Sequence, residues 1–176
     1  MVDNQALWRF FERELFALTL GATAQRSDLY ASDLGEAARR PFQNSLRQSL
    51  ETLAESYRKS VAESLHIANI QRLGDELSGK HSELLVSGRM RFGHAQKALN
   101  LYLKYLWCLQ KVEEPPHFPV DSIILKKIPK FTTFRWTRME SSEQYVKIIE
   151  AAREQARRQN LSLACWELRE YKRRDA

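Results

Sequence analysis

Apolar residues recur every three or four positions along most of this chain, which is the period of an amphipathic helix. Near the N-terminus this spacing predicts a first helix, with Asp3 or Asn4 as its cap and Gly21 as its end. Further on, Ser32-Asp33 ahead of LGEAARR indicates a short helical turn that Pro41 ends or restarts. The apolar positions of the first helix are Leu7, Phe10, Phe11, Leu15 and Leu18.

A longer stripe predicts an amphipathic helix from Phe42 to about Leu73, with one break near Leu65. Because the stripe ends at Gly74 and Gly79, a helix of a bundle is favoured over a coiled coil. Its members are Leu46, Leu50, Leu53, Tyr57, Val61, Leu65 and Ala68.

The next helix is expected over residues 95 to 111 and is apolar on more than one face, which is typical of a central, buried helix. Three glycines between residues 78 and 93 predict turns before it, and the segment EEPPHFP stops it. Asp121-Ser122 then caps a short helix that Pro129 ends.

The C-terminal part adds two more predicted helices. FTTFRW, residues 131 to 136, is β-prone and reads as a short extended link. Ser141-Ser142 caps the helix YVKIIEAAREQARRQ, and Asn160 separates it from LSLACWELREYKRR. The pattern predicts a single all-α domain, residues 1–176, that forms a bundle of about seven or eight helices.

Composition narrows the function classes. The net charge of +6 and the pI near 9.4 suit an anionic partner such as nucleic acid. Cys108 and Cys165 lie in apolar helical patterns and are expected to be reduced and buried. With no histidine or cysteine at metal-ligand spacing, neither a metal nor a cofactor is expected. The absence of an apolar run of membrane-spanning length predicts a cytoplasmic protein without membrane contact.

One lysine stands out, because Lys97 lies at the head of the predicted buried helix in GHAQKALN. Burying an ammonium group is costly unless the charge is paired, lost by deprotonation or used. A helix start also disfavours positive charge and lowers a lysine pKa. Lys97 is therefore a candidate nucleophile.

The segment around this lysine resembles the helix-hairpin-helix DNA glycosylases, and is closest in pattern to the archaeal 8-oxoguanine glycosylases. The resemblance rests on Lys97-Ala98-Leu99-Asn100 followed by Phe118-Pro119-Val120-Asp121, with HIANIQRLGDEL upstream. It covers about residues 65–125, within a glycosylase-like core of about residues 65–130, and implies a helix-hairpin-helix element. It also implies a DNA partner and, for an enzyme, DNA N-glycosylase and abasic-site lyase activity in base excision.

The resemblance assigns Lys97 as the nucleophile that forms a Schiff base and Asp121 as its acid-base or electrostatic partner. Residues near the glycine turn would bind the nucleic-acid backbone, and aromatic side chains would stack on a base or wedge the duplex. The backbone-binding candidates are Gly88, Arg89, Arg91, Gly93, His94 and Gln96. The aromatic candidates are Phe92, Trp107, Phe118 and Trp136.

Two other hypotheses stay open from the sequence. Lys97 can be a structural lysine and Asp121 an ordinary helix cap, in a non-catalytic helical protein that binds nucleic acid or a protein partner. The long stripe from Leu46 to Ala68 also fits an oligomerising helical bundle, so a homo-oligomer is possible.

Overall fold

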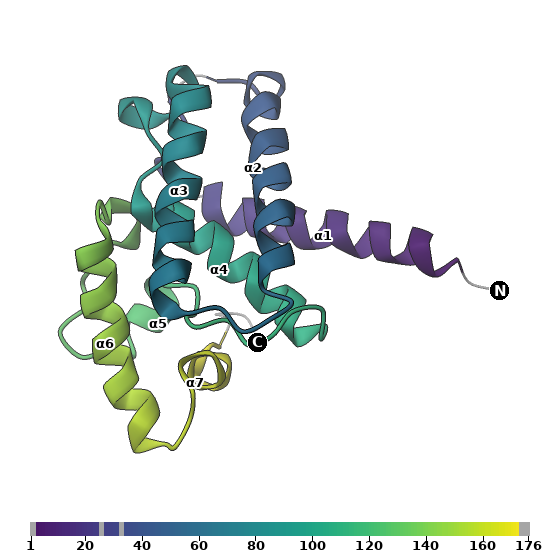
Figure 1. Ribbon diagram of the computed structural model, residues 1–176. Coiled ribbons are helices and arrows are strands. Elements are labelled where there is room, and N and C mark those ends of the chain that lie inside the picture. Colours follow the sequence, from purple (N-terminus) through teal and green to yellow (C-terminus); the bar gives the residue numbers. More distant parts are fainter. Residues whose placement is uncertain (1–2, 25–26, 32–33, 173–176) are drawn as a thin grey trace.

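The computed structural model describes residues 3–24, 27–31 and 34–172, and this part of the chain is all-α (Figure 1). Its only extended pairing there is one isolated antiparallel bridge between Tyr30 and Leu85. The α-helices are α1 (Asn4–Ala24), α2 (Glu36–Ser56), α3 (Glu63–His81), α4 (Phe92–Cys108), α5 (Ser122–Leu125), α6 (Ser142–Arg158) and α7 (Leu163–Glu170). Three short 3-10 turns are η1 (Ser82–Leu84), η2 (Val86–Gly88) and η3 (Trp136–Arg138). The prediction of an all-α bundle of about seven or eight helices is confirmed.

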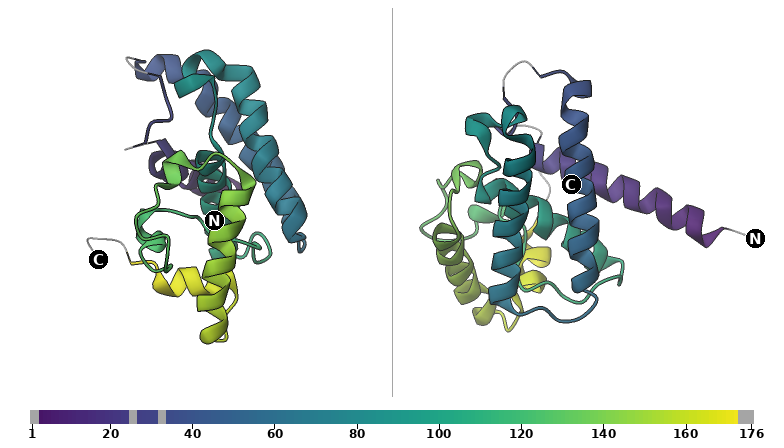
Figure 2. Two further views of the ribbon diagram at one scale, coloured as in Figure 1. Left: turned by 90° about the vertical axis from the view of Figure 1, so that its left-hand side faces the viewer. Right: turned by 45° about the horizontal axis from the view of Figure 1, so that its top comes forward.

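Helix α4 forms the centre of the fold, as its apolar pattern predicts. Every residue from Phe92 to Lys104 is buried, and α1, α2, α3 and η3 all pack against this helix. Helices α2 and α3 run antiparallel beside each other, and α1 crosses them (Figures 1 and 2). The central helix begins and ends three residues earlier than predicted. No described helix is long and apolar enough to cross a bilayer.

Side-chain caps fix the starts of several helices, and the sequence predicts the caps of α1 and α6. The Asp3 carboxylate accepts the N–H groups of Gln5 and Ala6 at 2.9 and 3.2 Å. Such caps satisfy N–H groups that have no partner within the helix. Ser141 and Ser162 cap α6 and α7 in the same way, and Asn160 breaks the chain between them with φ of +55°.

The stripe predicted from Phe42 to about Leu73, with one break near Leu65, forms two helices, but the position of the break differs. The break spans residues 57–62 rather than the surroundings of Leu65, and α2 starts earlier, at Glu36, and continues through Pro41. Ser32 and Asp33, which the sequence places in a short turn, lie outside the described residues. The chain's own core buries four residues of the stripe, so this part of it is not an exposed surface for a second copy. These residues are Leu46, Leu50, Leu53 and Tyr57.

Helix α1 forms as predicted but continues past Gly21 to Ala24, and it turns an unexpected face to the core. Of the five apolar residues that define its stripe, only Leu15 is buried; Thr19 and Thr23 complete the buried face. The other four, Leu7, Phe10, Phe11 and Leu18, are 41 to 52 % exposed. The N-terminal half of α1 projects beyond the other helices (Figures 1 and 2).

Two further expectations are wrong. The cysteines are free thiols, but they are not buried as expected: Cys108 is exposed at the end of α4 and Cys165 is partly exposed. FTTFRW forms no extended link: its backbone turns, with Phe134 N–H bonded to the Phe131 carbonyl oxygen at 3.0 Å, and leads into η3. Phe131 and Phe134 pack against the core.

Gly93 is required by a close approach between α4 and η3. Its N–H donates to the Met139 carbonyl oxygen at 2.9 Å, and a Cβ atom there would collide with the Trp136 carbonyl group. Gly93→Ala should therefore lower the free energy of unfolding by about 1 to 3 kcal/mol through forced displacement of η3. Urea denaturation measures this loss.

The matched control is Gly79→Ala, because Gly79 lies in helix α3 with open space around its Cβ position. Alanine is the better helix former, so this change should stabilise by up to about 1 kcal/mol. An unchanged denaturation midpoint for Gly93→Ala would contradict the close packing of η3 on α4.

Candidate functional site

Lys97 and Asp121 are in direct contact. The Lys97 Nζ atom lies 2.7 Å from Asp121 Oδ2, and the two residues are only 3 and 7 % exposed. Lys97 lies in the second turn of α4, whereas Asp121 is the cap of α5, where its Oδ1 accepts the N–H groups of Ile123 and Ile124 at 2.9 and 3.0 Å. Asp121 thus divides its two oxygens between a helix start and an ammonium group.

Gln96 and Asn100 fasten the segment before Asp121 onto α4. The Gln96 amide donates to the Val120 carbonyl oxygen at 2.8 Å and accepts the Val120 N–H at 3.0 Å. One turn later, the Asn100 amide donates to the Phe118 carbonyl oxygen at 2.9 Å. Two-point binding of this kind imitates strand pairing, so it fixes the backbone that presents Asp121.

A second buried ion pair follows two turns along the same helix. Lys104 Nζ lies 2.7 and 3.0 Å from the two carboxylate oxygens of Glu167 in α7, and 4.5 Å from the Tyr171 ring centre. Burial raises the pKa of Glu167, although Lys104 opposes this rise. Sequence reasoning missed this pair; its signal was a lysine in the middle of the apolar run LYLKYLW.

A chain of polar groups continues from this site through the core. The Tyr145 hydroxyl accepts a hydrogen bond from the Asn100 amide and lies 3.0 Å from His117 Nδ1. The other His117 ring nitrogen lies 2.8 Å from Glu63, which also pairs with Arg153 at 2.7 Å. The polar side of α4 is therefore connected to the surface through a continuous series of hydrogen bonds, which offsets the cost of burying these groups.

The predicted backbone-binding residues are divided between the core and internal ion pairs. Gly93, His94 and Gln96 are buried in α4. Gly88 occupies a turn with φ of +70°, where a side chain would be strained. Arg89 and Arg91 both pair with Glu140, at 3.0 and 3.1 Å, and Arg91 also pairs with Asp28 at 2.7 Å. The chain's own carboxylates thus neutralise both arginines.

The four aromatic candidates differ in their exposure. Phe92 and Phe118 are core residues, packed on Tyr145 and Trp166 with ring centres 5.3 and 5.6 Å apart. Trp107 and Trp136 are partly exposed, and Trp136 lies against His94 with ring centres 5.6 Å apart. Of the four, only Trp107 and Trp136 are open to solvent to any useful extent.

His94 lies in the core beside Trp136, and neither of its ring nitrogens has a hydrogen-bond partner in the described residues. Burial lowers its pKa to about 4, against the attraction of Asp28, whose Oδ1 lies 3.9 Å from Nε2. Burial and the neighbouring His117 lower the pKa of His66 to about 3. Both rings are therefore neutral in the folded protein at neutral pH.

These histidines should make stability depend on pH. The unfolded chain binds their protons near pH 6.5 and the folded chain does not, so acid favours unfolding. The free energy of unfolding should decline between pH 6.5 and 5, by up to about 1.4 kcal/mol per pH unit for each histidine. Urea denaturation at several pH values measures the slope. His94→Gln should have a shallower slope, and an equal slope in this window would contradict the role of His94.

A surface feature that sequence reasoning missed lies directly after α5. Residues 126–138, here called the basic segment, contain five basic residues and no acidic residue, which is five of the net six positive charges of the chain. All five are exposed. Among the described residues, only Lys127 forms an ion pair, with the Glu170 carboxylate at 3.7 Å. The five are Lys126, Lys127, Lys130, Arg135 and Arg138. The signal was present in KKIPKFTTFRWTR.

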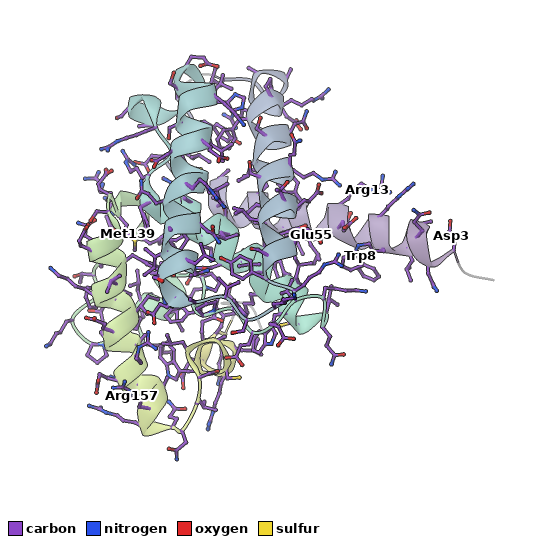
Figure 3. The ribbon with its side chains drawn as sticks, viewed as in Figure 1. Asp3, Trp8, Arg13, Glu55, Met139 and Arg157 are labelled. Atoms are coloured by element: carbon purple, nitrogen blue, oxygen red, sulfur yellow. The ribbon has the colours of Figure 1, made fainter. Side chains whose placement is uncertain are left out.

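The basic segment lies between two elements that contact the first turns of α4. It begins after α5, whose cap Asp121 contacts Lys97, and it ends in η3, which packs beside Gly93 and His94. Met139, just after the segment, marks the place where it meets α6 in Figure 3. The exposed positive charge and the buried Lys97–Asp121 pair thus occupy neighbouring parts of one region.

No family model, curated protein or solved structure matches this chain. Within the described residues, no three histidine, cysteine, aspartate or glutamate side chains converge to hold a metal ion.

Proposed function

We propose that this protein binds nucleic acid through the basic segment. The observation that carries the proposal is the concentration of five exposed positive charges in thirteen residues without a single carboxylate among them. Phosphate contacts by lysine and arginine supply most of the affinity of a protein for nucleic acid. In contrast, Arg89 and Arg91 are already paired with carboxylates of the chain.

Aromatic residues interleave with these charges and extend the proposal to base contacts. Phe131, Phe134 and Trp136 are partly exposed, and Phe131 and Phe134 pack edge to face with ring centres 6.1 Å apart. Basic and aromatic side chains in alternation are typical of surfaces that bind single strands, where bases stack on the rings.

The test is fluorescence anisotropy with labelled single-stranded and double-stranded oligonucleotides between about 50 and 200 mM salt. We expect binding that weakens linearly on a log-log plot, with a slope near −0.9 per phosphate contact for a duplex and about −0.7 for a single strand. Absence of binding at the lowest salt concentration, or affinity that salt does not change, would overturn the proposal.

The contact between Lys97 and Asp121 favours a second candidate, the glycosylase and lyase chemistry that the sequence resemblance implies. A deprotonated Lys97 amine would attack C1′, the base would leave with the electrons of the glycosidic bond, and Asp121 would accept the amine proton. Opening of the sugar ring would then give a Schiff base. Because Lys97 is buried, this chemistry requires residues 118–121 to move and admit the sugar.

Borohydride trapping tests the second candidate separately from binding. Duplexes that carry an abasic site or 8-oxoguanine are incubated with the protein and reduced, and a covalent adduct is sought. We expect an adduct that disappears in Lys97→Ala and in Lys97→Arg, which keeps the positive charge but has no primary amine. If no adduct forms while oligonucleotides still bind, the chemistry is excluded and the binding proposal stands.

A further inference from the structure

A groove separate from the basic segment opens between α1, α2 and the end of α4. It has a volume of about 290 Å³ and is lined by side chains of all three helices and of residues 110–112. Trp8 comes from α1 and Glu55 from the last turn of α2, and the two residues lie near each other in Figure 3. The residues used below are Trp8, Glu12, Glu51, Glu55, Tyr102 and Lys111.

Tyr102 marks the floor of this groove. It is only 2 % exposed, and its hydroxyl group has no hydrogen-bond partner in the part of the chain that the structure describes. Burial and, to a smaller extent, the carboxylates of Glu51 and Glu12 raise the pKa of Tyr102 to about 12, so its hydroxyl group keeps its proton at neutral pH. Tyr102 lines the groove, so a ligand bound there would give its hydroxyl group a hydrogen-bond partner.

The charges around Tyr102 favour a cation. Glu12 has no ion-pair partner among the described residues, whereas Glu51 pairs with Arg47 at 2.7 Å and Glu55 with Arg58 at 2.9 Å. Both of those pairs join residues of one helix or its end and are solvent-exposed, so they are weak. Glu12 is thus the carboxylate most available to a positively charged ligand.

Trp8 adds an aromatic surface that already accepts a cation. Lys111 Nζ lies over its ring, 4.6 Å from the ring centre, and has no carboxylate within ion-pair distance among the described residues. The groove therefore already holds one ammonium group on an aliphatic side chain, that of Lys111. Attraction between a cation and a ring face stabilises such an arrangement.

We propose that this groove binds a small aliphatic amine, with one ammonium group between Glu12, Glu51 and the Tyr102 hydroxyl group. The aliphatic part lies along Trp8, where it displaces or adjoins the Lys111 ammonium group. The ammonium group donates to the Tyr102 oxygen and to the carboxylates, which supplies the partners that the groove lacks. This binding is independent of nucleic acid, because the basic segment contributes no residue to the groove.

Isothermal titration calorimetry of the full chain with 1,4-diaminobutane tests the proposal, with 1,4-butanediol as the uncharged probe. We expect saturable binding of the diamine and none of the diol. Glu12→Gln should weaken binding about tenfold or more by removing the charge partner, and Tyr102→Phe about two- to tenfold by removing one hydrogen bond. Circular dichroism confirms that each variant is folded.

The control variant is Glu76→Gln, which removes an equal charge from an exposed position of α3 that does not line the groove. Its affinity for the diamine should match that of the unaltered protein. Any of three results overturns the proposal: no saturable heat with the diamine, equal binding of the diol, or unchanged affinity in Glu12→Gln. An equal loss in Glu12→Gln and Glu76→Gln also overturns it, because it would show attraction to overall charge only.

Discussion

Replacing all five basic residues of the basic segment by alanine should abolish nucleic-acid binding at about 150 mM salt. The change lowers the net charge from +6 to +1, and it removes the exposed cations that are available for phosphate groups. Because these five cations no longer meet phosphate groups, affinity should fall by about a hundredfold or more at low salt, and the salt slope should flatten by up to about 4.5 units for a duplex. Anisotropy titrations at several salt concentrations measure both effects.

A charge-matched control separates local contacts from overall charge. Alanine at Arg9, Arg40, Lys59, Lys80 and Lys147 also removes five exposed positive charges, from four helices and one connection, and gives the same net charge of +1. This variant should lose much less affinity than the variant of the basic segment. If both variants lose the same affinity, binding depends on the net charge of the protein rather than on the basic segment.

The sequence predicts the centre of the fold well because the centre has the clearest local pattern. Helix α4 is apolar on nearly every side, and the caps Asp3, Asp121 and Ser141 are local signals that the structure confirms. The break between α2 and α3 has no such signal, since residues 57–62 contain neither glycine nor proline and the helical spacing continues across them. It is held by a distant contact, in which the Glu113 N–H donates to the Tyr57 carbonyl oxygen at 2.8 Å.

Helix α1 shows a different limit of prediction from periodicity. Its residues are apolar on two faces, so periodicity identifies a helix without deciding which face meets the core. The same holds for the candidate site. A motif relates Lys97 to Asp121, 24 positions apart, whereas no local pattern relates Lys104 to Glu167 across 63 positions. The Lys104–Glu167 pair depends on where α7 lies relative to α4 in the fold, which the sequence alone does not show.

Asp121→Asn should destabilise the protein by about 3 to 5 kcal/mol, because it leaves the Lys97 ammonium group buried without a counter-charge. Asparagine is also a good helix cap, so the hydrogen bonds at the start of α5 remain and the loss reports the charge. Asp121→Ala should lose about 1 kcal/mol more through the cap itself. Urea denaturation measures each variant against the unaltered protein.

The double variant Lys97→Met with Asp121→Asn tests whether the ion pair serves stability or chemistry. Buried ion pairs are often replaced by uncharged residues of similar volume with little loss of stability, so the double variant should be more stable than Asp121→Asn alone. A double variant as stable as the unaltered protein, yet without the trapped adduct, would assign the pair to chemistry. The single variant Lys97→Met completes the comparison. If the stability losses of Lys97→Met and Asp121→Asn simply add in the double variant, the pair contributes no coupling energy, and the predicted stabilisation of Lys97 by Asp121 is wrong.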